Sequence, residues 1–248
     1  MPLIIWILAF TLLGSIGAII GASFVLVLKD KHRSVLIPSF VSYATGTLLG
    51  SAFLGMIPKA LHHSSYLSVS AMILVGIILF FLLEKLVIWR HCHKENCETH
   101  TRAGPLILIG DAFHNFIDGV VIATAFLSDI RLGMVTSIAV IAHEIPQEMG
   151  DFAILLQSGY TRQKALLYNF LSAISSLPGA AAAYFYLKTE QVVVPYVLAI
   201  SAASFIYIAL ADLIPGLHRT IDFKKSIIQL FLMLGGIGTI ALFALHHG

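Results

Sequence analysis

The sequence predicts an all-α polytopic membrane protein with eight transmembrane helices. Two observations carry this prediction. Of the 248 residues, 58% are hydrophobic and only 11% are charged, whereas a soluble domain has about 25% charged residues. The apolar residues also gather in runs of about 20, the length of helix that crosses the hydrocarbon core of a bilayer. We therefore expect one transmembrane domain over residues 1–248.

The apolar runs follow one another along the whole chain. In order, the predicted helices cover residues 3–28, 36–57, 67–89, 105–127, 133–156, 164–187, 193–214 and 226–246. The first run begins almost at once, without the basic region and small-residue cleavage site of a signal peptide, so we expect a retained helix. Polar segments end the successive runs at residues 29–33, 59–65, 90–102, 128–131, 158–164, 188–191 and 217–225.

The distribution of Lys and Arg predicts how the helices are oriented. Basic residues concentrate in alternate connections, and cytoplasmic loops carry such an excess. The basic connections are residues 29–33, 90–102, 162–164 and 219–225. With eight crossings, this bias places both termini outside and the loop 90–104 in the cytosol. Cys92 and Cys97 lie in that loop and are expected to be thiols.

A short repeat suggests internal symmetry. Residues 56–62 read Met-Ile-Pro-Lys-Ala-Leu-His at the end of the second predicted helix, and residues 213–218 read Leu-Ile-Pro-Gly-Leu-His at the end of the seventh. These two helices run in opposite directions, as expected for inverted repeats that flank a central helix pair. The alternative is that two helices end in proline and histidine by coincidence.

Polar side chains line the fourth and fifth predicted helices in spite of their apolar surroundings. The fourth carries, at spacings of three and four residues, Asp111, His114, Asn115 and Asp118. The fifth carries His143, Glu144, Gln147, Glu148 and Asp151. Residues three or four apart share a helix face, and both histidines lie near the bilayer midplane by helix rise.

This concentration of acids requires a compensating positive charge. An ionised carboxylate at the bilayer centre costs about 2.5–3.5 kcal/mol on the insertion scale, and no Lys or Arg lies near these acids in sequence. Imidazole, carboxylate and amide together suit a borderline divalent cation such as Zn²⁺, Fe²⁺ or Mn²⁺. Pro146 loosens the fifth helix beside these groups. The alternative is a buried hydrogen-bonded network that only joins two helices.

The same residues resemble the signature helices of the ZIP (Zrt/Irt-like) metal transporters. The resemblance lies in His-Asn-Phe-Ile-Asp-Gly at 114–119 and His-Glu-Ile-Pro-Gln-Glu-Met-Gly-Asp-Phe at 143–152, and it extends to residues 48–58 and 209–215. It implies an eight-helix bundle in a 3+2+3 inverted-repeat arrangement. The expected function is transport of divalent metal ions into the cytoplasm, zinc above all, with iron, manganese and cadmium as further candidates. We expect a plasma-membrane homodimer in lipid, with no organic cofactor and no nucleic-acid partner.

The resemblance also implies which residues bind metal. One ion would be held by His114, Asp118, His143 and Gln147, and a second by Asn115, Asp118, Glu144 and Gln147. The position of Gln147 is often His or Glu in the family, and a neutral amide is a weaker ligand.

Two further groups of residues are candidates for metal contact. The remaining acids lie toward the predicted cytoplasmic face, so we expect a hydrated exit route there, with an outer half closed by apolar side chains. The acids of that route are Asp111, Glu148, Asp151 and Asp212. The cytosolic loop offers ligands of its own, unless it is only a solvated polar loop. These loop candidates are His91, Cys92, His93, Cys97 and His100.

Two rival functions share part of this pattern. His143-Glu144 begins like the His-Glu-x-x-His motif of zinc proteases, but Gln147 replaces the second histidine and Pro146 interrupts the helix, so we do not expect an enzyme. A metal exporter built on a His-x-x-x-Asp pair would match His114 and Asp118. The fifth helix does not repeat that pair, and the direction of metal flux would separate the two kinds of transporter.

Overall fold

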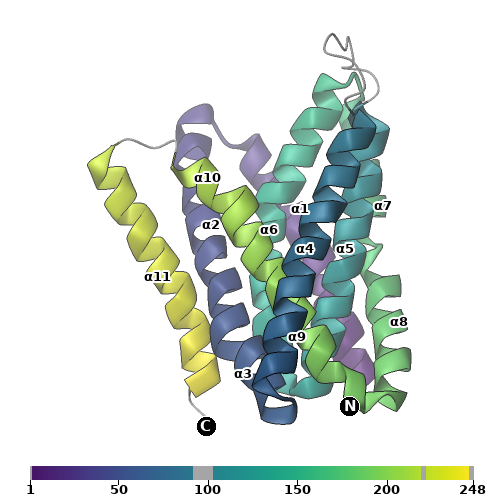
Figure 1. The fold of residues 1–248 in the computed structure, drawn as a ribbon. Helices are drawn as coiled ribbons and strands as arrows, with labels where there is room; N and C mark the ends of the chain where they lie inside the picture. The colour runs from purple at the N-terminus through teal and green to yellow at the C-terminus, as the bar shows by residue number, and fades with distance from the viewer. Residues whose placement is uncertain (1, 92–102, 219–221, 246–248) are drawn as a thin grey trace.

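The computed structural model describes residues 2–91, 103–218 and 222–245, and Figure 1 shows them as a bundle of helices. The described helices form eight rods, each of them one helix or several helical segments joined end to end. The first four rods are α1 (Leu3–Val27), α2–η1–α3 (Asp30–Gly50, Ser51–Met56, Ile57–His63), α4 (Tyr66–His91) and α5 (Ala103–Ser128). The last four are α6 (Ile130–Gln157), α7–α8 (Arg162–Ala173, Ser176–Thr189), η2–α9–η3–α10 (Gln191–Val193, Val194–Tyr207, Ile208–Leu213, Ile214–Leu217) and α11 (Phe223–Leu245). The described residues contain no strand, so the all-α prediction is confirmed.

The rods suit a membrane. Six of them are long and apolar enough to cross one by length and composition, and the other two, α5 and α6, carry the polar stripes. Helices suit this setting because each satisfies its backbone hydrogen bonds internally. The beginning of α1 and the end of α11 lie at the same end of the bundle (Figure 1), as an even number of crossings requires.

Prolines account for the main departures from the predicted helices. The predicted helix 164–187 is divided at Ile174 because Pro178, four residues later, has no N–H to donate to the Ile174 carbonyl. The π-helical segments η1 and η3 each end two residues before a proline, Pro58 and Pro215 respectively. Each proline lacks an N–H, so a helical hydrogen bond is missing beside each π segment.

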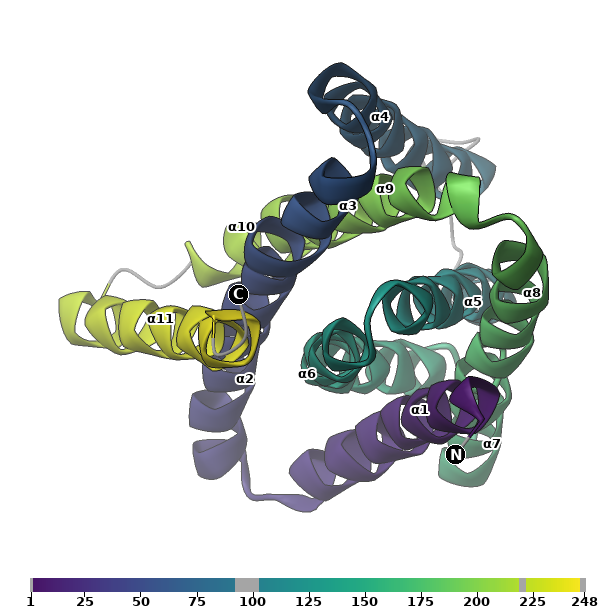
Figure 2. The same cartoon turned by 90° about the horizontal axis from the view of Figure 1, so that it is seen from below.

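The rods form two groups, which Figure 2 shows from below. In the first group α5 packs on α8 and α1 packs on α6; in the second α2 packs on α11 and α4 packs on α9. Backbones approach closely where α5 meets α8. A Cβ atom at Gly119 would collide with the Ser176 carbonyl oxygen, and one at Gly179 with the Phe116 carbonyl oxygen. Small residues permit such contacts between membrane helices.

A tight turn sets the register of α5 and α6. Asp129 caps α6, and its side chain accepts hydrogen bonds from the backbone N–H groups of Arg131 at 2.9 Å and Leu132 at 3.1 Å. The turn makes α5 and α6 antiparallel neighbours, so their polar faces meet in the middle of the bundle.

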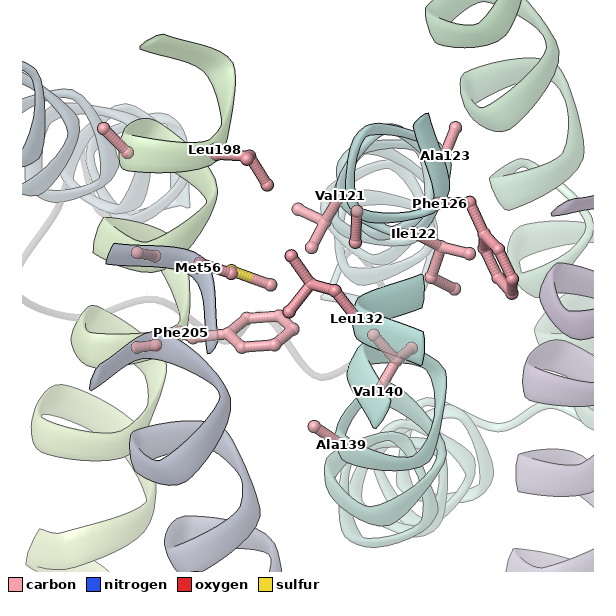
Figure 3. Close-up of a cluster of buried hydrophobic side chains, with 14 of the residues drawn as sticks. Met56, Val121, Ile122, Ala123, Phe126, Leu132, Ala139, Val140, Leu198 and Phe205 are labelled. Atoms are coloured by element: carbon pink, nitrogen blue, oxygen red, sulfur yellow. The ribbon is translucent and has the colours of Figure 1, made fainter. Parts of the chain in front are cut away.

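An apolar core joins the two groups of rods near that turn. Figure 3 shows Met56, Leu198 and Phe205 pointing from η1 and α9 toward the α5–α6 pair. They meet Val121 and Leu132 there, within one cluster of buried side chains. This core lies between the polar stripes and the end of the bundle that holds the termini.

Candidate metal site

Four metal-ligating side chains converge where α5 faces α6. They are His114 and Asp118 from α5, and His143 and Glu144 from α6. One ligand atom from each lies within 4.8 Å of all the others. His114 and Asp118 are one helical turn apart, and the antiparallel packing brings the adjacent pair on α6 to the same depth.

The distances among these atoms fit a small tetrahedral ion. His114 Nε2 lies 3.3 Å from His143 Nε2 and 3.3 Å from Glu144 Oε1. His143 Nε2 lies 3.2 Å from Asp118 Oδ2 and 3.4 Å from Glu144 Oε1. The distance from His114 Nε2 to Asp118 Oδ2 is longer, at 3.9 Å. Ligands about 2.0–2.1 Å from a tetrahedral ion are about 3.3–3.4 Å apart. Three of the five distances lie in this range and a fourth, at 3.2 Å, lies just below it.

His143 is oriented by a backbone hydrogen bond. Its Nδ1 lies 3.0 Å from the Ala139 carbonyl oxygen. A carbonyl can only accept, so Nδ1–H donates, and Nε2 is the nitrogen that faces the other three groups and would bind a metal when it carries no proton. The ring of Phe205 packs against the His143 ring with centroids 6.0 Å apart. Phe205 also belongs to the apolar core described above, so this ring contact joins the site to that core.

The site has buried polar atoms without hydrogen bonds. Asp118 and Glu144 are each 2% exposed. Asp118 Oδ2 and both carboxylate oxygens of Glu144 accept no hydrogen bond, although imidazole nitrogens lie within ion-pair distance of them. Buried charged oxygens are costly unless paired or bound to metal. A divalent cation among the four ligands would satisfy them.

The two amide side chains turn toward Asp111. Gln147 Nε2 donates to Asp111 Oδ1 at 3.3 Å, and Asn115 Nδ2 donates to the same oxygen at 3.0 Å. The first ligand set implied by the resemblance places Gln147 with both histidines. In the structure Glu144 also lies beside the histidines, and the Gln147 amide nitrogen donates to a carboxylate, which is a strong acceptor.

A second compact group lies one turn further from the α5–α6 turn. It consists of Asp111, Glu144 and Glu148, with one carboxylate oxygen of each within 4.8 Å of the others. Glu144 belongs to both groups. The sequence predicted these acids as part of a spaced route and did not indicate that they converge.

The other predicted route residues lie outside both groups. Asp151 is partly exposed, and Asp212 is exposed in η3. Asp111 and Glu148 are buried, at 5% and 1% exposed, and the hydrated exit route stays a prediction. In the outer half, the apolar core described above lies between the polar stripes and the α5–α6 turn.

One residue that the sequence analysis did not select touches this region. Asn169 of α7 is buried, and its Nδ2 donates to the Glu148 carbonyl oxygen at 3.1 Å. Asn169 also lines a small cavity with Glu148 and Ser23. The available signal was a single amide, Asn169, within the predicted apolar run 164–187.

The proposed ligands of the connecting loop are not placed by the structure. His91 ends α4, and the other candidates, Cys92, His93, Cys97 and His100, lie outside the described residues.

Comparison with known proteins agrees with the resemblance seen in the sequence. Residues 90–244 match the family described as "ZIP Zinc transporter". The chain is 30% identical to zinc transporter zipt-7.2 of Caenorhabditis elegans, over 88% of this chain and 60% of that protein. It is 30% identical to zinc transporter ZIP13 of Pongo abelii, over 88% of this chain and 70% of that protein. The match to zinc transporter foi of Drosophila melanogaster is 37% identical and covers 61% of this chain but only 21% of that longer protein.

Proposed function

The chain belongs to the ZIP zinc transporter family, and on that premise we propose that it carries divalent metal ions, zinc first among them, across a membrane through the α5–α6 site. Residues 1–248 would act as one transporter domain. The observation that carries the proposal is the near-tetrahedral spacing of four ligand atoms from His114, Asp118, His143 and Glu144. Zn²⁺ prefers nitrogen and oxygen ligands in this geometry, and a borderline ion such as Fe²⁺ or Mn²⁺ also accepts them.

Family membership separates this proposal from the enzymatic alternative. ZIP family members are transporters and not enzymes. The arrangement of the residues agrees, because Glu144 lies among the metal ligands and does not stand apart as a base. The His-Glu pair of the protease-like motif is therefore reassigned to metal binding.

We propose that ions move toward the end of the bundle where α4 meets α5, taken as the cytoplasmic end. The support is the bias of Lys and Arg to alternate connections. The acids also follow this direction, since Asp111 and Glu148 lie on that side of the histidines. Proteins that export metal would need the reverse direction, and zinc flux measured in proteoliposomes of known protein orientation distinguishes the two.

We also propose that the first three and last three rods are inverted repeats around α5 and α6. Two observations support this arrangement. The π segments η1 and η3 are both six residues long and stand at the same distance before a proline. The packing is also paired, because α1 on α6 corresponds to α8 on α5, and α2 on α11 corresponds to α9 on α4.

The plasma-membrane location and the homodimer stay proposals, to be tested by localisation and by mass measurement in detergent.

Zinc uptake into proteoliposomes tests the proposed transport. An entrapped zinc indicator should report flux from the wild-type protein and a rate near background from His143→Ala, with both proteins equally folded.

An impermeant thiol reagent gives the orientation of the protein in the membrane. It should label Cys92 and Cys97 in cells only after the membrane is opened. Labelling of intact cells would reverse the topology and the direction of transport.

A further inference from the structure

Three carboxylates meet on the inner side of the histidines without any basic side chain among them. Asp111 comes from α5, while Glu144 and Glu148 lie one turn apart on α6. Each offers an oxygen within 4.8 Å of the other two. Within the described residues, the basic groups at ion-pair distance from this cluster are His114 and His143, and both reach it only through Glu144.

The cluster is buried, and most of its oxygens lack partners. Asp111, Glu144 and Glu148 are 5%, 2% and 1% exposed. Both carboxylate oxygens of Glu144, both of Glu148, and Oδ2 of Asp111 accept no hydrogen bond. Ionised together at this distance, the three carboxylates would repel one another strongly in a region away from water. A cation among the free oxygens would remove both the repulsion and the loss of hydrogen bonding.

Neighbouring amides hold the cluster in a suitable orientation. Asn115 and Gln147 both donate to Oδ1 of Asp111, which leaves Oδ2 free. Asn169 donates to the backbone carbonyl of Glu148 and fixes α7 against that turn of α6. Outer-shell hydrogen bonds of this kind orient carboxylates that bind metal.

We propose that Asp111, Glu144 and Glu148 form a second divalent-cation site, made only of carboxylate oxygens, one turn inward of the histidine site. Carboxylate ligands suit hard divalent cations, of which Mn²⁺ is the accessible probe. The site differs from the second ligand set implied by the family resemblance, which contains neither Asp111 nor Glu148. Its existence does not depend on the proposed function, but its role does.

That role follows from the shared ligand. Glu144 belongs to both sites, so an ion that leaves the histidines keeps one carboxylate bond while it exchanges imidazole nitrogens for carboxylate oxygens. The transfer therefore needs no fully unliganded ion inside the protein. This step rests on the proposed function for the direction of ion movement.

Mn²⁺ binding to the purified protein in detergent tests the site without measuring transport. We expect the double variant His114→Ala/His143→Ala to bind one Mn²⁺ whose pulsed electron paramagnetic resonance spectrum shows no imidazole nitrogen. Adding Glu148→Gln to this variant should weaken Mn²⁺ binding at least tenfold, as should adding Asp111→Asn. The matched control is Asp129→Asn, which makes the same chemical change at an exposed cap and should leave binding unchanged.

The outcomes separate this proposal from the proposed function. Melting temperature and gel filtration first establish that each variant is folded. If folded wild-type protein binds no Mn²⁺, or if Glu148→Gln and Asp111→Asn leave binding intact, the carboxylate site is wrong. If the wild-type protein shows the Mn²⁺ site but no zinc flux, the proposed transport function is wrong and the carboxylate site is not affected.

Discussion

The α5–α6 pair is built differently on the two sides of its histidines. Toward the α5–α6 turn, neither helix carries an acid between Asp118 and Glu144 except the cap Asp129. That half buries apolar side chains, chiefly Val121, Ile122, Phe126, Leu132 and Val140. In the opposite direction, buried carboxylates continue beyond the site, at Asp111 and Glu148. Both halves are packed, but with opposite chemistry.

This difference determines what each half requires in order to open. Apolar side chains from both groups of rods meet in the outer half (Figure 3). Under the proposed function, we expect an ion to pass there only when those groups separate and admit water. The inner half offers carboxylate oxygens, so we expect it to need less rearrangement to become hydrated. Charged residues in membrane helices are tolerable beside water or a cation. We therefore expect changes in the two halves to have different effects, and six substitutions in four groups test this.

The largest effect is expected at the boundary between the halves. His143→Ala and His114→Ala each remove one of the four proposed ligands of the candidate metal site. Zinc flux in proteoliposomes should fall at least about 100-fold, because even outer-shell changes cost about 10–100-fold in metal affinity or activity. Gel filtration in detergent checks folding. Near-normal flux in both variants would show that the central ligands lie elsewhere.

The inner half should control release. Asp111→Asn or Glu148→Gln removes a charge that would receive the departing ion, so maximal flux should fall roughly fivefold, which is about 1 kcal/mol in the barrier. The apparent affinity for zinc should change little. Asp129→Asn is the matched change at the outer end, where Asn still caps a helix, and its flux should stay within about twofold of wild type. Inner variants that lose affinity and keep maximal flux would contradict this difference between the halves.

The contrast between the two halves also shows how much of the structure could be predicted from the sequence alone. Apolar runs of membrane length predicted all eight rods, because a bilayer permits few alternatives to a helix. The spacing of His114, Asp118, His143 and Glu144 placed them on facing stripes. The convergence of Asp111 with Glu148 could not be predicted, because it depends on the rotation of α6 against α5. The hydrogen bond from Asn169 to the Glu148 carbonyl could not be predicted either, because Asn169 lies on a third helix, α7.

The outer half should control stability more than release. Phe205→Ala leaves a cavity beside His143 and the apolar core. We expect a loss of about 1–3 kcal/mol, less than in many soluble cores because lipid replaces part of the lost apolar environment. Thermal unfolding in detergent measures it. Leu74→Ala on α4, where the side chain is 60% exposed on the bundle surface, is the control and should have little effect. Equal destabilisation by both would mean that the outer half is not tightly packed.

The smallest effect is expected at Gln147, which lies between the two sites. Its amide nitrogen donates to Asp111, so it is oriented by the inner carboxylates in this conformation. An imidazole at this position would lie near the histidine site. It would, however, weaken the hydrogen bond that the Gln147 amide donates to Asp111. Gln147→His should therefore raise zinc affinity by less than about threefold while it shifts preference from Mn²⁺ toward Zn²⁺, because imidazole favours zinc. Competition between the two metals during uptake measures both quantities, with Gln191→His as the same change at an exposed position. A gain of tenfold or more would place residue 147 among the ligands of the histidine site, and the boundary between the two halves would then lie one turn further inward.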